Sequence, residues 1–206
     1  MFCTDSKSFM GYDTANLGHT RIGGYVRFGL NFGGIDMRFD VMPVATEKQM
    51  TEIEETARYV WHNYYKDIFS PEQIEYMLHQ YQSKEAIKAQ SGKGYIYYML
   101  MSDGALAGYT CVKLEKDYAY VSRLYIKPEY RRQGLARRTI AHFNAIFSSK
   151  EHGLDYIKSL KLKVERNNNF AINVYEHLGF QKIKSVDTNI GGGFVCREYV
   201  MERKVT

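Results

Sequence analysis

Hydrophobic residues recur with clear regularity from Met37 to the C-terminus. The stretch MRFDVMPV has strand character and ends near Pro43. Thr46 and Gln49 then form the pattern of a capping box at a helix start. The apolar residues that follow are spaced as on one face of a helix, at positions 53, 57, 60, 61 and 64. The pattern therefore predicts a strand and then an amphipathic helix that packs into the core.

A second helix start follows at Ser70, with Pro71 in its first turn. Apolar residues at positions 74, 77, 78 and 81 form the core-facing stripe of this helix. The loop that joins the two helices, HNYYKDIFS (62–70), is rich in aromatic and polar groups. We expect this loop to line a substrate entrance.

Three strands are predicted next, at 95–101, 105–115 and 118–126. The first link contains Asp103-Gly104, which is a strong hairpin signal because both residue types tolerate positive φ. Short links of this kind join neighbouring antiparallel strands, so we expect the three strands to pair in that way.

The last third of the chain contains apolar residues at both helical and strand spacing. It predicts a helix at 134–149, a strand at 159–165, a helix at 169–178 that ends at Gly179, and two strands around a flexible Gly191–Gly193 turn. The order of elements is β-αα-βββ-α-β-α-ββ. This order indicates an α/β fold with a mixed, mostly antiparallel sheet.

The first 36 residues differ from the rest. They hold seven of the 17 glycines and show neither helical nor strand periodicity. They also lack the apolar core of a secretory signal. We expect a Gly-rich flexible extension at 1–36, an expression remnant, or residues upstream of a start at Met37, with the folded domain at 37–206.

Composition and charge narrow the class of protein. The chain has 206 residues, of which 45% are hydrophobic, enough for one domain with a sizeable core. Its net charge of +5 fits a small anionic ligand but is too weak to indicate nucleic acid. No run approaches the length of a membrane span. Cys3, Cys111 and Cys196 are far apart and the six His lack zinc-type spacing, so we expect a reducing, cytoplasmic compartment and no metal.

The stretch IKPEYRRQGLARRTI (126–140) carries the first candidate chemistry. Arg131, Gly134 and Ala136 stand where a strand gives way to a helix. A helix start offers backbone N–H groups and a positive dipole end, and a glycine there lets a phosphate approach closely. The pattern fits a pyrophosphate site, although taken alone it favours the alternative of a solvated basic turn. Neither a P-loop nor a dinucleotide-binding glycine motif is present.

A second stretch, NNNFAINVYEHLGF (167–180), favours the first interpretation. Together with RLYIKPEYRRQGLA, it resembles the GNAT acetyltransferase superfamily, and the resemblance covers about residues 39–205. The family pattern [RQ]-x-x-G-x-[GA] matches at Arg131, Gly134 and Ala136. The second family pattern matches at Asn168, Ala171, Tyr175, Gly179 and Phe180. The two motifs are separated by the helix and the strand that the family has between them.

The resemblance implies an enzyme that moves an acetyl group from acetyl-CoA to a primary amine by direct attack in a ternary complex. The family fold splays the strand at 120–126 from the strand at 159–165, and acetyl-CoA lies in the gap. By analogy, backbone groups of Leu124, Tyr125 and Ile126 would contact the pantetheine arm and the thioester carbonyl. The pyrophosphate would lie on backbone N–H groups of the loop formed by Arg131, Arg132, Gln133, Gly134, Leu135 and Ala136.

Two residues of the second motif have implied roles as well. Asn168 would contact the pantetheine, with a plain helix N-cap as the alternative. Tyr175 would protonate the departing thiolate, since a hydroxyl with a reference pKa of about 10 is a suitable acid for a thiolate. The alternative for Tyr175 is inward packing beside Leu178.

The motifs do not fix the general base. Many family members have a glutamate just before the Arg of the middle strand, or on the following strand, where this chain has Ser122 and Lys163. The candidate base is therefore Glu165 at the end of that strand, with a surface ion pair or an ordered water as the alternatives. The missing glutamate disfavours a ribosomal-protein N-terminal acetylase.

The substrate is indicated more weakly. The segments YYKDIFSPEQIEYML and IGGGFVCREYVMERK are similar to the polyamine-acetylating branch of the family, although Cys196-Arg197-Glu198 departs from the more acidic tail of that branch. Polyamine ammonium groups need carboxylates. Candidates in the helical region that covers the acceptor side in the family are Glu47, Glu52, Glu54, Glu55, Asp67, Glu72 and Glu75, with solvated helix faces as the alternative.

We therefore expect a small amine or polyamine as the partner that accepts the acetyl group. A protein N-terminus or lysine, or acyl-CoA binding without catalysis, are the alternatives. Neither nucleic acid nor a membrane is expected as a partner. The dimers that are frequent in the family leave a homodimer open.

Overall fold

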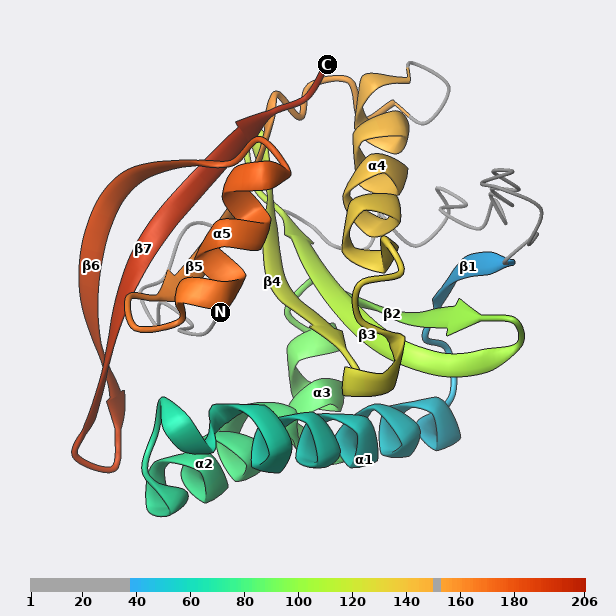
Figure 1. The fold of residues 1–206 in the computed structure, drawn as a ribbon. Coiled ribbons are helices and arrows are strands. Elements are labelled where there is room, and N and C mark those ends of the chain that lie inside the picture. Colours follow the sequence, from blue (N-terminus) through green and yellow to red (C-terminus); the bar gives the residue numbers. More distant parts are fainter. Residues whose placement is uncertain (1–37, 150–152) are drawn as a thin grey trace.

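A seven-stranded sheet forms the centre of the molecule in the computed structural model, which describes residues 38–149 and 153–206 (Figure 1). The strand order is β1-β2-β3-β4-β5-β7-β6. All neighbouring strands are antiparallel except β4 and β5, which are parallel. The predicted α/β fold with a mixed, mostly antiparallel sheet is confirmed. The strands are β1 Phe39–Pro43, β2 Tyr95–Ser102, β3 Ala105–Leu114, β4 Tyr118–Ile126, β5 Ser159–Glu165, β6 Gln181–Gly191 and β7 Phe194–Lys204.

Five α-helices accompany the sheet in the described residues: α1 Glu47–Tyr64, α2 Pro71–Met77, α3 Lys84–Ser91, α4 Leu135–Ser148 and α5 Asn169–His177. Short helical turns lie at η2 Tyr65–Asp67, η3 Leu78–Gln82 and η4 Pro128–Tyr130. The capping box at Thr46 and the Pro71 start of α2 are confirmed. The sequence pattern did not predict α3, because this helix has only eight residues and a short apolar stripe around Ile87.

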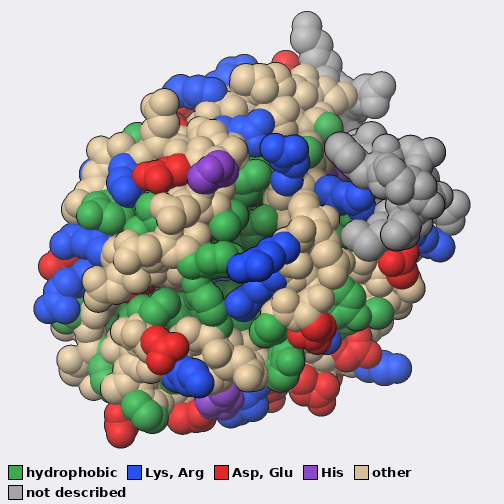
Figure 2. Space-filling model, viewed as in Figure 1, with side chains coloured by type: hydrophobic (Ala, Val, Ile, Leu, Met, Phe, Trp, Pro, Cys, Tyr) green, Lys and Arg blue, Asp and Glu red, His purple; other side chains and the backbone are tan. Residues whose placement is uncertain are grey.

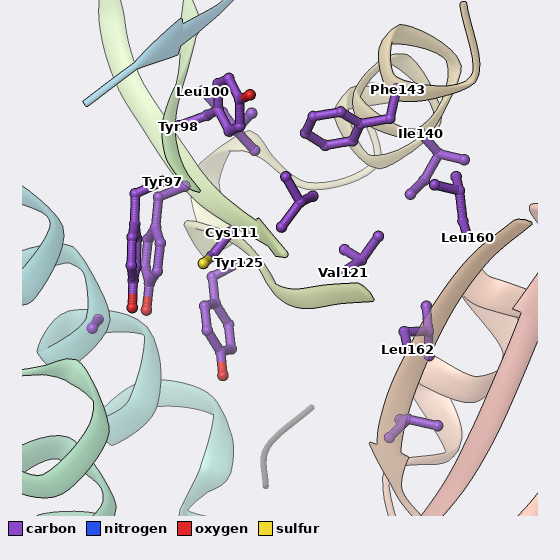
Figure 3. Close-up of a cluster of buried hydrophobic side chains, with 14 of the residues drawn as sticks. Tyr97, Tyr98, Leu100, Cys111, Val121, Tyr125, Ile140, Phe143, Leu160 and Leu162 are labelled. Atoms are coloured by element: carbon purple, nitrogen blue, oxygen red, sulfur yellow. The ribbon is translucent and has the colours of Figure 1, made fainter. Parts of the chain in front are cut away.

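Helices cover both faces of the sheet, as two consecutive residues of β2 demonstrate. Neighbouring side chains on a strand point to opposite faces. The Tyr98 ring packs against Phe143 of α4, with ring centroids 5.4 Å apart. The Tyr97 hydroxyl donates to Gln90 of α3 at 3.0 Å. Figure 3 shows Phe143 and Ile140 above the sheet and the Tyr97 and Tyr125 rings pointing away from them.

The turns of two hairpins differ in what they contact. The turn at Asp103-Gly104 has positive φ at both residues, 48° and 82°, as its sequence predicts. The turn between β6 and β7 was expected to be flexible, yet it packs on α2. The carbonyl of Ile190 accepts hydrogen bonds from the hydroxyls of Tyr76 (2.7 Å) and Tyr81 (2.9 Å). A Cβ atom added at Gly191 would lie 2.4 Å from the Tyr76 hydroxyl, so this close approach requires glycine.

The feature that creates room for a site is the divergence of β4 from β5. These strands pair only at Tyr118, Ala119 and Tyr120 of β4. A register shift in the pairing of β3 with β4 occurs just beyond, between the partners Val121 and Arg123. A bulge of this kind bends a strand locally. The second half of β4 therefore leaves β5, and the predicted splay of the central strands is confirmed.

The predicted extension at 1–36 lies outside the described residues. None of the helices in the described part of the chain is long and apolar enough to cross a membrane.

Candidate active site

A cavity of about 480 Å³ lies where β4 and β5 diverge. Figure 2 shows hydrophobic side chains lining a hollow on this face, with Lys and Arg side chains at its rim. The walls come from α1 and η2, the end of β4, the loop into α4 with the first turn of that helix, the end of β5, and α5. The lining residues are Val60, Tyr64, Tyr65, Leu124, Tyr125, Ile126, Tyr130, Arg131, Arg132, Gly134, Leu135, Ala136, Arg137, Val164, Asn168, Phe170, Ala171, Asn173, Val174, Tyr175, His177 and Leu178.

Backbone groups of β4 are directed into the gap. The N–H of Lys127 donates to Ala107 on β3 at 2.9 Å. Alternate residues of a strand direct their N–H and C=O groups to the same side, so those of Leu124 and Ile126 are directed away from β3. The Ile126 carbonyl accepts a hydrogen bond there from Nε of Arg131 at 3.1 Å. Leu124 is therefore the β4 residue whose backbone is best placed to meet a ligand.

The loop into α4 has the geometry of an anion site. Gly134 is the N-cap of this 14-residue helix and has φ of 76°, in the left-handed region. A Cβ atom added at Gly134 would meet no protein atom within 4 Å, so the space above the helix start is open. The first N–H groups of an α-helix lack intrahelical acceptors and lie at its positive end. The residues present thus fit a phosphate group at the cavity wall.

Of the six predicted loop residues, Gln133 is the one that does not line the cavity. Its side-chain amide donates to the Glu129 carbonyl at 3.1 Å instead. Arg131 lines the cavity, but its side chain is engaged with the Ile126 carbonyl and with the face of Tyr64. Arg132 has φ of 60° and an exposed side chain at the rim.

Asn168 is the helix N-cap that the sequence offered as one of its two roles. It is 2% exposed, and its Oδ1 atom accepts a hydrogen bond from the Ala171 N–H at 3.1 Å, so it caps α5. The same oxygen accepts a hydrogen bond from the Tyr64 hydroxyl at 2.8 Å. Asn168 also lines the cavity, so capping and ligand contact are compatible.

Tyr175 lies on α5 and lines the cavity with only 5% of its surface exposed. Its ring packs edge to face on Phe180, with centroids 5.8 Å apart. Burial raises the pKa of Tyr175 well above its ordinary value, and the neighbouring Tyr65 and Tyr64 raise it further. The hydroxyl therefore stays protonated at physiological pH, which a proton donor requires.

Glu165 is placed differently from the other predicted residues. It is 6% exposed and does not line the cavity, although Val164 before it does. Its Oε2 atom accepts a hydrogen bond from the Arg197 N–H at 3.0 Å, and Glu198 is its partner across β5 and β7. Burial raises the pKa of Glu165, opposed by the hydrogen bond from Arg197. The alternative of a surface ion pair for Glu165 is therefore wrong, because its carboxyl group is buried.

The seven carboxylates expected to hold ammonium groups do not line the cavity. Glu47 pairs with Lys84 (2.9 Å) and Lys88 (2.7 Å). Glu75 pairs with His62 and Arg58. These contacts on the outer faces of the helices match the alternative of solvated helix faces. Within residues 38–149 and 153–206, no group of three or more His, Cys, Asp and Glu side chains could hold a metal ion.

Sequence reasoning missed the wall that α1 supplies. Val60 and Tyr64 near its end, and Tyr65 after it, face the cavity. The only available signal was the aromatic loop HNYYKDIFS, which was expected to line an entrance. The structure places its two tyrosines in the cavity wall instead, beside the loop into α4 and the start of α5.

Comparisons with known proteins find relatives over most of the chain. A family model described as "Acetyltransferase (GNAT) family" matches residues 53–180. A spermidine N(1)-acetyltransferase of Thermoplasma acidophilum is 27% identical over 173 residues, covering 82% of this chain and 98% of that protein. A ribosomal protein bS18-alanine N-acetyltransferase of Escherichia coli is 29% identical over 100 residues, covering 48% and 64%.

Solved structures show the same fold. A PaiA N-acetyltransferase from Thermoplasma acidophilum, in complex with coenzyme A, has a TM-score of 0.63 and 25% identity, covering 81% of this chain and 98% of that chain. The ribosomal-protein-S18-alanine N-acetyltransferase from Escherichia coli has a TM-score of 0.58 and 18% identity, covering 82% and 94%.

Proposed function

Because the chain belongs to the GNAT acetyltransferase family and is an acetyl-CoA-dependent N-acetyltransferase, we propose that its acceptor is a primary amine of a small molecule or polyamine. The observation that carries this proposal is the extent of similarity to a spermidine N(1)-acetyltransferase. That similarity runs over 98% of the relative's length, including the regions outside the two cofactor motifs. Acceptor specificity depends on those outer regions, so similarity there bears on the substrate.

The residues of the cavity have distinct tasks in this reaction. The start of α4 binds the pyrophosphate through its backbone N–H groups, and the open space at Gly134 admits it. The backbone of Leu124 supplies a fixed donor to the thioester carbonyl oxygen, where negative charge develops as the neutral amine attacks. Tyr175 donates its proton to the thiolate that leaves. Arg131 holds the end of β4 in place through the Ile126 carbonyl.

The amine must lose a proton before or during attack. Glu165 is the candidate base because burial raises its pKa, and a carboxylate with a raised pKa is a stronger base than an ordinary one. Its place behind Val164, outside the cavity lining, favours transfer through one ordered water molecule.

A protein N-terminus is the second candidate acceptor. The bS18-alanine N-acetyltransferase of Escherichia coli matches this chain at 29% identity, which favours it. That match covers only 48% of this chain. The match therefore includes less of the region where acceptors are selected. For this reason we rank a protein N-terminus second.

An amine panel tests the choice between the two acceptors. Thiol release from acetyl-CoA would be measured with spermidine, spermine, monoamines, amino acids and short peptides that begin with alanine. We expect turnover with polyamines or other small amines, and product mass spectrometry showing one added acetyl group. Turnover confined to the peptides would overturn the proposal in favour of the second candidate.

A further inference from the structure

Tyr64 touches both walls of the cavity from a third element. It is the last residue of α1 and is half-buried. Its hydroxyl donates to Oδ1 of Asn168 at the start of α5, at 2.8 Å. The face of its ring is covered by the guanidinium of Arg131, whose central carbon lies 4.6 Å from the ring centroid. One side chain thus joins the loop into α4 to the N-terminus of α5.

The hydrogen bond from Tyr64 to Asn168 stabilises the start of α5. The buried Oδ1 atom accepts hydrogen bonds from two donors, the Tyr64 hydroxyl and the Ala171 N–H. Together these bonds fix the side chain that caps the helix, and a capped first turn opens less often than a frayed one. The same helix carries Tyr175 two turns further on. Loss of the Tyr64 hydroxyl should therefore loosen the helix start that positions Tyr175.

The stacking of Arg131 on the Tyr64 ring restrains the loop into α4. Nε of Arg131 donates to the Ile126 carbonyl, and the guanidinium plane is held at the same time by the Tyr64 ring. Stacking on an aromatic face restricts an arginine that would otherwise sample many rotamers. Arg131 is the first residue of the loop that ends at Gly134. Its anchoring therefore fixes where the α4 N-terminus lies relative to the open end of β4.

We propose that Tyr64 is a positioning residue for acetyl-CoA, which acts on the loop through Arg131 and on α5 through Asn168. The inference rests on the proposed function, since it assigns the cavity to acetyl-CoA. The two actions use different parts of the side chain, the ring for Arg131 and the hydroxyl for Asn168. Substitutions can therefore separate them.

The experiment compares Tyr64→Phe, which keeps the ring, with Tyr64→Leu, which removes both contacts. Tyr156→Phe is the matched control, because this tyrosine is 42% exposed and does not line the cavity. Coenzyme A affinity would be measured by calorimetry, together with kcat and the KM for acetyl-CoA. Hydrogen exchange of the Ala171 amide would be measured in the ligand-free protein.

We expect Tyr64→Phe to keep the coenzyme A affinity within about twofold but to lower kcat and to accelerate exchange at Ala171. Tyr64→Leu should weaken the affinity by about tenfold in addition. In an Arg131→Gln background, Tyr64→Leu should weaken affinity much less than it does alone, because the partner of the ring is already gone.

Two outcomes would overturn the inference in different ways. If the wild type binds coenzyme A and all Tyr64 variants bind and exchange as it does, with only a lower Tm, Tyr64 merely anchors α1. If the wild type itself does not bind coenzyme A, the proposed function fails, and the positioning role fails with it.

Discussion

Tyr175 is held in surroundings that keep its hydroxyl protonated. Burial and two neighbouring tyrosines raise its pKa, and its ring is fixed against Phe180. Tyr175→Phe keeps the ring and removes only the hydroxyl group that carries the proton. We expect kcat to fall by about 100-fold, because a positioned general acid contributes on that order. The dissociation constant of coenzyme A should change by less than about twofold.

Steady-state kinetics and calorimetry on the same preparation would check this pair of outcomes, with Tyr156→Phe as the control. An unchanged kcat would remove Tyr175 from the chemistry and leave it the packing role beside Leu178. A weakened coenzyme A affinity with unchanged kcat would assign the hydroxyl to binding alone.

The role of Glu165 as the general base can also be tested with a single substitution. Its raised folded-state pKa means that the folded protein favours the protonated form, so ionisation at neutral pH costs stability. Glu165→Gln keeps an acceptor for the Arg197 N–H and should not lower the Tm at pH 7. A base acts only when deprotonated, so wild-type kcat should fall as the pH drops through the raised pKa of Glu165.

The variant should lose that acid limb of the pH profile and show kcat lower by at least about tenfold. Parallel pH–rate profiles and melting curves would measure both effects. If kcat of Glu165→Gln stays within twofold of the wild type and the acid limb persists, water without this carboxylate carries the proton.

At the scale of elements, the loop into α4 can be tested against a matched turn elsewhere. Gly134 and Gly94 have φ of 76° and 84°, and a Cβ atom at either would meet no protein atom within 4 Å. Alanine at either position should cost about 1 kcal/mol, because left-handed backbone disfavours a Cβ atom. Gly134→Ala alone should weaken coenzyme A binding, by about tenfold or more, since its methyl group enters the phosphate space.

Chemical denaturation and calorimetry on both variants would separate the backbone effect from the ligand effect. Equal losses of stability with wild-type affinity in Gly134→Ala would mean that the phosphate does not approach this glycine.

The elements differ in how far local sequence determines them. Asp103-Gly104 and the Thr46 capping box are formed by residues close in the chain, so their patterns predict them directly. The helix α3 is too short to give a clear stripe, and η3 is a π-helical turn that depends on tertiary contacts. The packing of Gly191 on Tyr76 joins segments more than a hundred residues apart, which no local pattern records.

At the scale of the whole molecule, the site is an assembly of distant segments. The motif residues Gly134, Asn168 and Tyr175 were predictable because family resemblance identifies them. Tyr64 was not, since its role depends on a hydrogen bond to a residue 104 positions away. For Glu165 the sequence predicts the strand end correctly. It does not predict whether the Glu165 side chain lies in the cavity or beside β7.

Stability toward acid is a property of the whole fold, and His142 contributes to it from α4. Its side chain is buried at 3% exposure, and burial lowers its pKa from 6.5 to about 4. The unfolded chain binds this proton near pH 6.5 but the folded protein does not until about pH 4, so stability falls as the pH drops between these values. The full effect is about 3 kcal/mol. Glu47, Glu75 and Glu202 have lowered pKa values and also lose stabilisation in acid.

His142→Gln should therefore remain acid-sensitive but lose less unfolding free energy than the wild type between pH 7 and pH 4.5. Urea denaturation at both pH values, with the exposed His79→Gln as control, would measure the difference. Equal losses in wild type and His142→Gln would mean that the folded protein binds a proton at His142 as readily as the unfolded chain does.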